Sequence, residues 1–190
     1  MKQPRFTTVQ DLFEAYSRAA DDVGEADPGM GSLDFLQQLV EKRKWEPAIS
    51  FCAYLLPKRE AVVWGCRSLR RMTNQFNADE ERALAYAEEW ATEPEEWRRV
   101  RALTLGNRID QRSAAAWLAL AAGWSGGSVM PPEYDHREAT PEQTARAVRL
   151  ALFISLAYLA RDVTDGIMAA CLADGIASVL CNVMTTNCSG

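Results

Sequence analysis

The stretch REAVVWGCRSLRRM, residues 59–72, decides the fold class that this sequence predicts. Its apolar residues recur every three or four positions, which is the period of one face of an α-helix. The apolar face holds Val62, Cys66, Leu69 and Met72, and the arginines beside it are Arg59, Arg67, Arg70 and Arg71. The run 61–64 alone would also suit a β-strand, but its flanks favour a helix. We therefore predict an amphipathic helix whose outer face is rich in arginine.

The same period extends along the chain in both directions, and most segments carry a start or stop signal. Thr7 with Gln10, and Asn77 with Glu80, have the spacing of a capping box. Further helix starts are expected at Ser32, Pro47, Pro94, Asp110, Thr140 and Thr164. Breaks are expected at residues 24–31, at Pro57, at Gly106-Asn107 and near Arg161. The sequence thus predicts an all-α fold, an irregular bundle of about eight or nine helices.

A possible internal repeat is the alternative to an irregular bundle. Four expected helix starts, at Glu46, Asn77, Asp110 and Thr140, lie 31, 33 and 30 residues apart. That spacing is close to the repeat of tetratricopeptide-type helical hairpins. The prolines that break the helices, Pro57 and Pro94, fall at different offsets within these units. We prefer the irregular bundle and keep solenoid-like helical hairpins as the alternative.

The whole chain, residues 1–190, is expected to form a single helical domain. Within it, residues 1–31 form an N-terminal helix and a linker, and residues 184–190 form a frayed tail. The apolar fraction of 48% is ordinary for a globular protein and too high for a disordered one.

Cysteine usage and the N-terminus predict a cytoplasmic protein. The five cysteines are an odd number and contain no C-x-x-C pair, so free thiols in a reducing compartment are the simplest account. Cys52, Cys66 and Cys171 lie on apolar faces and are expected in the core, whereas Cys188 is expected to be exposed. The N-terminus has no apolar signal-peptide region. The longest uncharged apolar run, residues 150–160, is too short for the roughly 20 residues of a membrane span, so none is expected.

Charge argues against a nucleic-acid partner, because the net charge is −5 and nucleic-acid binders usually carry a basic domain or stripe. Acidic residues concentrate in 11–34 and 79–96, and basic residues in 41–71 and 98–112. We expect these blocks to pair across neighbouring helices.

Residues 123–127, Gly-Trp-Ser-Gly-Gly, match the G-x-S-x-G motif of hydrolases that use a serine nucleophile. That motif needs a strand before the serine and a helix after it, whereas an alanine-rich helix precedes Ser125 and Pro132 follows. The single histidine, His136, lies in the same loop with Asp135 and Glu138, which is too few ligands to predict a metal site. No phosphate-binding or dinucleotide motif appears, so we expect no catalytic residues, no metal and no cofactor.

The same irregular segment, residues 123–139, is the best candidate for a partner-binding surface. Long loops are often functional, and tryptophan is enriched at binding hot spots. The candidate residues are Trp124, Ser125, Gly126, Gly127, Pro131 and Pro132.

Several segments carry a resemblance to a known family. They are YLLPKREAVVWGC at 54–66, AWLALA at 116–121, SGGS at 125–128 followed by Pro131-Pro132, and Trp90 followed by Pro94. Over residues 30–180 the chain is similar to an uncharacterised bacterial family of small all-helical proteins. The resemblance implies an association with type VI secretion gene clusters and no catalytic residues.

These observations predict a non-enzymatic accessory protein, an adaptor or chaperone-like module that binds a protein partner. The resemblance implies that this partner is a secretion component or an effector. An immunity protein that neutralises a toxin is the first alternative, since acidic helical proteins of this size often fill that role. A hydrolase that uses Ser125 is the second.

Overall fold

The computed structural model describes residues 5–131 and 133–185, and the side chains as far as Cys181. These residues form ten α-helices and no β-strand, which confirms the predicted all-α class. The helices are α1 (Val9–Ala15), α2 (Ala19–Val23), α3 (Ser32–Glu41), α4 (Trp45–Leu55), α5 (Lys58–Met72), α6 (Ala78–Thr92), α7 (Glu96–Arg108), α8 (Ala114–Gly123), α9 (Gln143–Leu156) and α10 (Arg161–Thr185).

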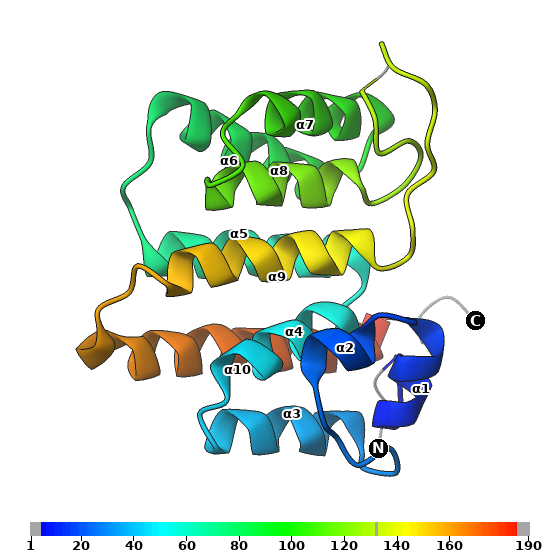
Figure 1. Cartoon of the computed structure of the whole chain (residues 1–190), viewed down its shortest axis with the longest axis vertical. Helices are drawn as coiled ribbons and strands as arrows, with labels where there is room; N and C mark the ends of the chain where they lie inside the picture. The colour runs from blue at the N-terminus through cyan, green and yellow to red at the C-terminus, as the bar shows by residue number, and fades with distance from the viewer. Residues whose placement is uncertain (1–4, 132, 186–190) are drawn as a thin grey trace.

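The helices are arranged in layers (Figure 1). One end of the molecule consists of α6, α7 and α8, and next to it α5 and α9 lie side by side. The following layer holds α4 and α10, with α2 against α4, and α3 and α1 complete the other end. In a solenoid each repeat contacts only its neighbours in sequence. Here α5 packs against α9 and α10, which come much later in the chain, so the arrangement is a bundle and not a solenoid.

The centre of the core is Trp64 on α5, which is almost fully buried. Its indole Nε1 donates a hydrogen bond of 2.8 Å to the carbonyl oxygen of Cys171 on α10. The ring lies against the backbone of Gly175, where an added Cβ would be 2.9 Å from Nε1. On another face of α5, a Cβ added at Gly65 would lie 2.7 Å from Leu118 of α8 and 3.0 Å from Val148 of α9. Through these residues helix α5 packs against α8, α9 and α10.

The N-terminal helices are held to this core by a charged cluster. The carboxylate of Asp22 on α2, only 8% exposed, accepts a hydrogen bond of 2.6 Å from the Tyr54 hydroxyl. It also pairs with Arg146 at 3.1 Å and Arg149 at 3.0 Å, both on α9. Burial and the adjacent Asp22 carboxylate raise the pKa of Tyr54. The cluster joins α2, α4 and α9, so α2 is held directly against the later helices.

Other charged residues pair as the block pattern predicts. Arg70 of α5 contacts Glu81 and Glu88 of α6 at 2.8 and 2.6 Å, and Arg101 of α7 pairs with Glu89. The acidic block 79–96 thus meets a basic block on each side. Asp22 departs from the prediction, because its partners lie on α9 and not in residues 41–71.

Two predicted helix starts can be compared with the hydrogen bonds observed. The capping box at Asn77 and Glu80 is confirmed, with bonds of 3.0 and 2.9 Å in the two directions. The box predicted at Thr7 and Gln10 is wrong by one residue, since Thr8 caps α1 and Asp11 completes the box. The Asp11 carboxylate accepts from the backbone N–H groups of Thr8 and Thr7, which lowers its pKa.

Several other predicted boundaries are wrong. Gly106 does not end α7, which continues to Arg108; instead it lets the helix approach Leu120 and the Ala116 carbonyl oxygen of α8. The Ser32 hydroxyl donates to the Phe6 carbonyl oxygen and does not cap α3. The first predicted helix divides into α1 and α2, and α9 ends at Leu156. Helix α10 begins at Arg161 and continues into the predicted tail as far as Thr185, and residues 186–190 lie outside the described part of the chain.

Among the described residues, one helical stretch, Arg161–Cys181 of α10, is long and apolar enough to cross a membrane by length and composition alone. In the structure 28% of an 18-residue window of that stretch is buried, and the buried face carries Met168, Cys171, Leu172 and Val179. This face packs on α3, α4 and α5, which accounts for part of its apolar composition.

The thiols of Cys52, Cys66 and Cys171 are buried in the core, as predicted, and burial raises the pKa of each. Cys181 on α10 is exposed, and Cys188 lies outside the described residues. Because the thiolate is the reactive form, the buried thiols should be inert in the folded protein.

We expect Ellman's reagent at pH 8 to label one thiol per chain in folded Cys188→Ser protein and four in urea. The single native signal should disappear when Cys181→Ser is added. Rapid labelling of a second thiol without denaturant would contradict the burial of the core cysteines.

The two glycines of α10 provide a matched test of the central contact. A Cβ at Gly175 would lie 2.5 Å from Cys52 Sγ, whereas one at Gly166 meets nothing within 4 Å. Gly175→Ala should therefore lower the free energy of unfolding by about 1–3 kcal/mol through overpacking. Gly166→Ala should leave it unchanged or raise it by up to about 1 kcal/mol through helix propensity. Urea denaturation measures both, and equal stabilities of the two variants would contradict this packing.

Candidate functional site

The segment that the sequence singles out begins where α8 ends, at Gly123. The Trp124 side chain is half-buried, and its ring packs edge-to-face on Trp117 with 6.0 Å between centroids. Its Nε1 donates to the carbonyl oxygen of Val129 at 3.2 Å. The indole of Trp124 is thus engaged within the chain and is not presented as a free anchor.

The following residues form a turn that is fixed by Arg99 of α7. The buried guanidinium of Arg99 donates to the carbonyl oxygens of Gly123 and Ser128, the latter at 3.1 Å, and pairs with Glu96 at 2.7 Å. Gly127 has φ +57, in the left-handed region, and a Cβ there would lie 2.9 Å from Arg99 Nη2. A glycine at this position satisfies both requirements.

The other predicted site residues lie around this turn. The Ser125 carbonyl oxygen accepts from Lys58 Nζ at 3.0 Å, and Gly126 is open on its Cβ side. Pro131 is buried, and Pro132 lies outside the described residues. The predicted residues are therefore close in sequence, and none of those that the structure describes lines the pockets described below.

The turn also lacks the geometry of a hydrolase elbow. Ser125 follows helix α8, not a strand, and the chain continues into an isolated bridge between Ser128 and Glu138. His136 is exposed on the same segment. Among the described residues, no group of three or more His, Cys, Asp or Glu side chains could hold a metal ion.

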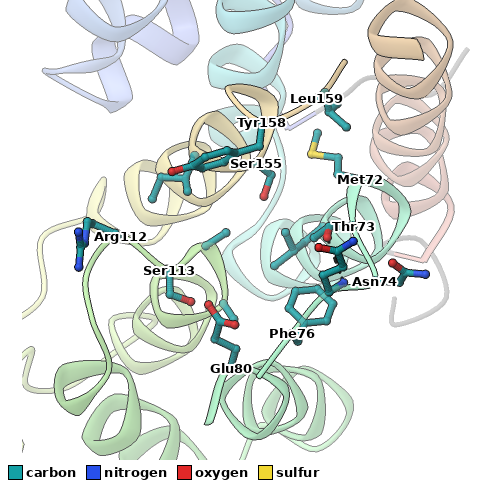
Figure 2. A pocket seen from close by; sticks show the side chains of 15 residues that line it. Met72, Thr73, Asn74, Phe76, Glu80, Arg112, Ser113, Ser155, Tyr158 and Leu159 are labelled. Carbon is teal, nitrogen blue, oxygen red and sulfur yellow. Dashed lines mark hydrogen bonds between the residues drawn. The ribbon is translucent and has the colours of Figure 1, made fainter. Parts of the chain in front are cut away.

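A different surface offers a cavity. A pocket of about 570 Å³ opens where α5 and α9 end and α6 and α8 begin (Figure 2). Tyr158 and Ser155 lie on one side of it, and Ser113, Glu80 and Phe76 on the other. A second pocket of about 390 Å³ adjoins the first, and both are lined by Arg112, Ile154 and Tyr158. We name the two pockets together the Tyr158 groove; their volumes lie in the range of ligand and peptide sites.

The centre of the groove is apolar and aromatic. Tyr158 is 85% exposed, the largest value among the exposed large hydrophobic residues described. Beside it the second pocket is lined by Trp117, Leu150 and Ile154, all half-buried. Because Trp117 packs on Trp124, the groove adjoins the predicted Gly-rich turn without including it. An apolar patch that contains an exposed aromatic ring is typical of an interaction surface.

The larger pocket adds polar groups to this apolar centre. Ser113 and Ser155 are each 8% exposed, and no hydrogen bond of the Ser155 hydroxyl is found among the described residues. Glu80 lines the pocket but is held by the Asn77 backbone N–H. Arg112 on the rim hydrogen-bonds Asp110 through its side chain and its backbone N–H, which lowers the pKa of Asp110 to about 2. Because it has no hydrogen-bond partner among the described residues, the Ser155 hydroxyl is available to a bound ligand.

Sequence reasoning missed this groove. The prediction placed Tyr158 inside a helix that continued to Arg161, whereas α9 ends at Leu156 and leaves Tyr158 exposed at the turn. The lining comes from four helix ends far apart in sequence, so no local motif marks it. The one available signal was the aromatic Tyr158 beside the expected helix end at Arg161.

The fold and the groove together define an all-α bundle with an amphipathic surface groove. The model of one protein family matches residues 35–179, and the chain belongs to that family, the family of unknown function DUF6931. This confirms that the chain belongs to an uncharacterised family and agrees with the predicted range of 30–180; no link to type VI secretion accompanies the match. Searches of curated proteins and of solved structures gave no match.

The turn after α8 should depend on Arg99. Arg99→Gln leaves the Gly123 and Ser128 carbonyl oxygens without their donor, which we expect to cost about 1–3 kcal/mol of unfolding free energy. Hydrogen exchange should accelerate at the amides of Val129 and Ala139, which bond to Arg137 and Gly127.

The control for this change is Arg137→Gln, which alters an exposed arginine of the same segment. Arg99→Gln also removes the ion pair that lowers the pKa of Glu96. The stability that this ion pair contributes is present above the ordinary glutamate pKa and is lost as the pH falls. Unchanged exchange at Val129 in Arg99→Gln would show that Arg99 does not hold the turn.

Proposed function

We propose that this protein is a non-catalytic interaction module that binds a segment of a partner protein in the Tyr158 groove. The observation that carries the proposal is the convergence of Trp117, Tyr158 and Arg112 on one groove. Tryptophan, tyrosine and arginine are the residue types most enriched at binding hot spots. Arg112 and Trp117 lie close together in sequence at the start of α8, whereas Tyr158 follows α9, so only the folded bundle brings the tyrosine to the other two.

The chemistry of the groove defines the segment that fits it. The aromatic part of the groove, which Leu150 and Ile154 also line, suits an apolar side chain of the bound segment. At the adjoining pocket, the hydroxyls of Ser113 and Ser155 can bond backbone groups of the same segment. A short apolar anchor flanked by polar backbone is the pattern of peptide recognition in grooves. The occupant is therefore a protein segment with an aliphatic or aromatic anchor.

The resemblance stated above extends the proposal to an adaptor or chaperone-like role in type VI secretion, in the cytoplasm, with a secretion component or effector as partner. An immunity role would use the same kind of surface against a toxin. Adjacent genes distinguish the two, because a toxin gene immediately upstream favours immunity. The third alternative, a hydrolase, predicts labelling of Ser125 by a fluorophosphonate probe in the folded protein.

Site-specific photo-crosslinking tests the groove. A benzophenone amino acid at position 158 should give discrete adducts in cells of the source organism, and one at Tyr134, which is 59% exposed, should not give the same adducts. Mass spectrometry of the adduct identifies the partner, and we expect it to be a secretion component or effector.

Affinity for the identified partner gives the quantitative test. Tyr158→Ala should weaken binding at least about 30-fold, the loss typical of a hot-spot residue, while Tyr134→Ala leaves it unchanged. Both tyrosines are exposed, so neither change should affect folding. Equal binding by the two variants would refute the groove as the binding surface.

A further inference from the structure

Another pocket, away from the Tyr158 groove on the face formed by α6 and α7, is lined by three arginines. It has a volume of about 320 Å³ and lies between Arg82 and Tyr86 of α6 and Arg101, Thr104, Leu105 and Arg108 of α7. None of these residues lines the Tyr158 groove, so this site is separate from the proposed partner surface. Three guanidinium groups around one hollow repel each other unless negative charge compensates them.

The compensation by the protein itself is incomplete. Arg101 is fixed, since it pairs with Glu89 and lies over the ring of Tyr86 at 4.0 Å from the centroid. Among the described residues Arg82 forms an ion pair only with Asp79, at 3.7 Å. Both side chains are exposed, and such pairs contribute little to stability. Arg108 has no acidic partner among the described residues. The C-terminal end of the α7 dipole favours a cation at Arg108, but it does not explain why three arginines face the same hollow.

One donor in this cluster is left without a hydrogen-bond partner. The Nε atom of Arg101 is buried and has no partner among the described residues, and it has almost no surface of its own, so a ligand in the pocket would meet the outer guanidinium groups of the arginines. The hydroxyl groups of Thr104 and Tyr86 add two more donors to the lining. The pocket therefore offers many donors and positive charge, and it requires an acceptor with several oxygens.

We propose that this arginine pocket binds a phosphate monoester. The guanidinium fork matches the oxygens of a phosphate in bidentate geometry, and Asp79 and Glu89 leave the three arginines with a net positive charge that attracts an anion. A carboxylate offers fewer oxygens and one charge. The ring of Tyr86 and the side chain of Leu105 form an apolar wall for the group that carries the phosphate.

Titration with simple phosphates tests the site on the full-length protein. We expect phenyl phosphate to bind more tightly than inorganic phosphate, because only the former contacts the Tyr86 and Leu105 wall, and benzoate to bind at least about ten-fold more weakly. Isothermal calorimetry at constant ionic strength measures all three. Tighter binding of inorganic phosphate would assign the site to the free ion and overturn the ester, and benzoate binding equal to phenyl phosphate would overturn phosphate selectivity.

Variants show whether binding occurs in this pocket. Arg108→Gln should weaken phenyl phosphate binding about ten-fold or more, whereas Arg137→Gln, an exposed arginine on the segment between α8 and α9, should leave it unchanged. Binding should also weaken as the pH falls through about 6, where a phosphate monoester loses its second negative charge. No binding of phenyl phosphate at millimolar concentration, or equal losses in the two variants, would overturn the proposal.

Discussion

The burial of Trp64 against the backbone of α10 is the contact on which the arrangement of the other helices depends. The indole needs both a flat neighbour and an acceptor, and α10 supplies them one turn apart as Gly175 and the Cys171 carbonyl oxygen. With α10 fixed on one side of α5, Gly65 can lie against α8 and α9 on the other. Helix α5 therefore contacts the layers on both of its sides, together with α9 beside it, and its buried face carries Trp64, Gly65 and Cys66.

Much of this fold follows from the sequence, because helix period and capping chemistry act locally. The face of Val62, Cys66, Leu69 and Met72 is buried as its spacing predicts, and Asn77 with Glu80 forms the expected cap. Errors occur where tertiary contacts override a local signal. Gly106 is a stop signal by sequence, but the approach of α8 makes a small residue necessary inside the helix. Which helices become neighbours is set by long-range packing, and the near-regular spacing of helix starts pointed toward a repeat that the packing does not form.

The site was less predictable than the fold for the same reason. The Gly-rich turn after α8 was predicted as the site because its residues are adjacent in sequence. In the structure these residues contact Arg99, Lys58 and Trp117 of the same chain. The Tyr158 groove and the arginine pocket combine residues from helix ends or helix faces that meet only in the bundle. Arginine recurs at these places in different roles. Arg99 is buried and holds a turn, Arg112 lies on the rim of a groove, and Arg108 has no acidic partner among the described residues.

The charged cluster around Asp22 has a consequence for how the family is delimited. The family match begins at residue 35, after α1 and α2, yet Asp22 is the carboxylate that both Arg146 and Arg149 of α9 contact. A protein trimmed to the matched boundaries would leave Arg146, Arg149 and the Tyr54 hydroxyl without the carboxylate that they share. The packed helices therefore extend beyond the matched residues 35–179. Expression boundaries for crystallisation should extend upstream of residue 35 to include α1 and α2.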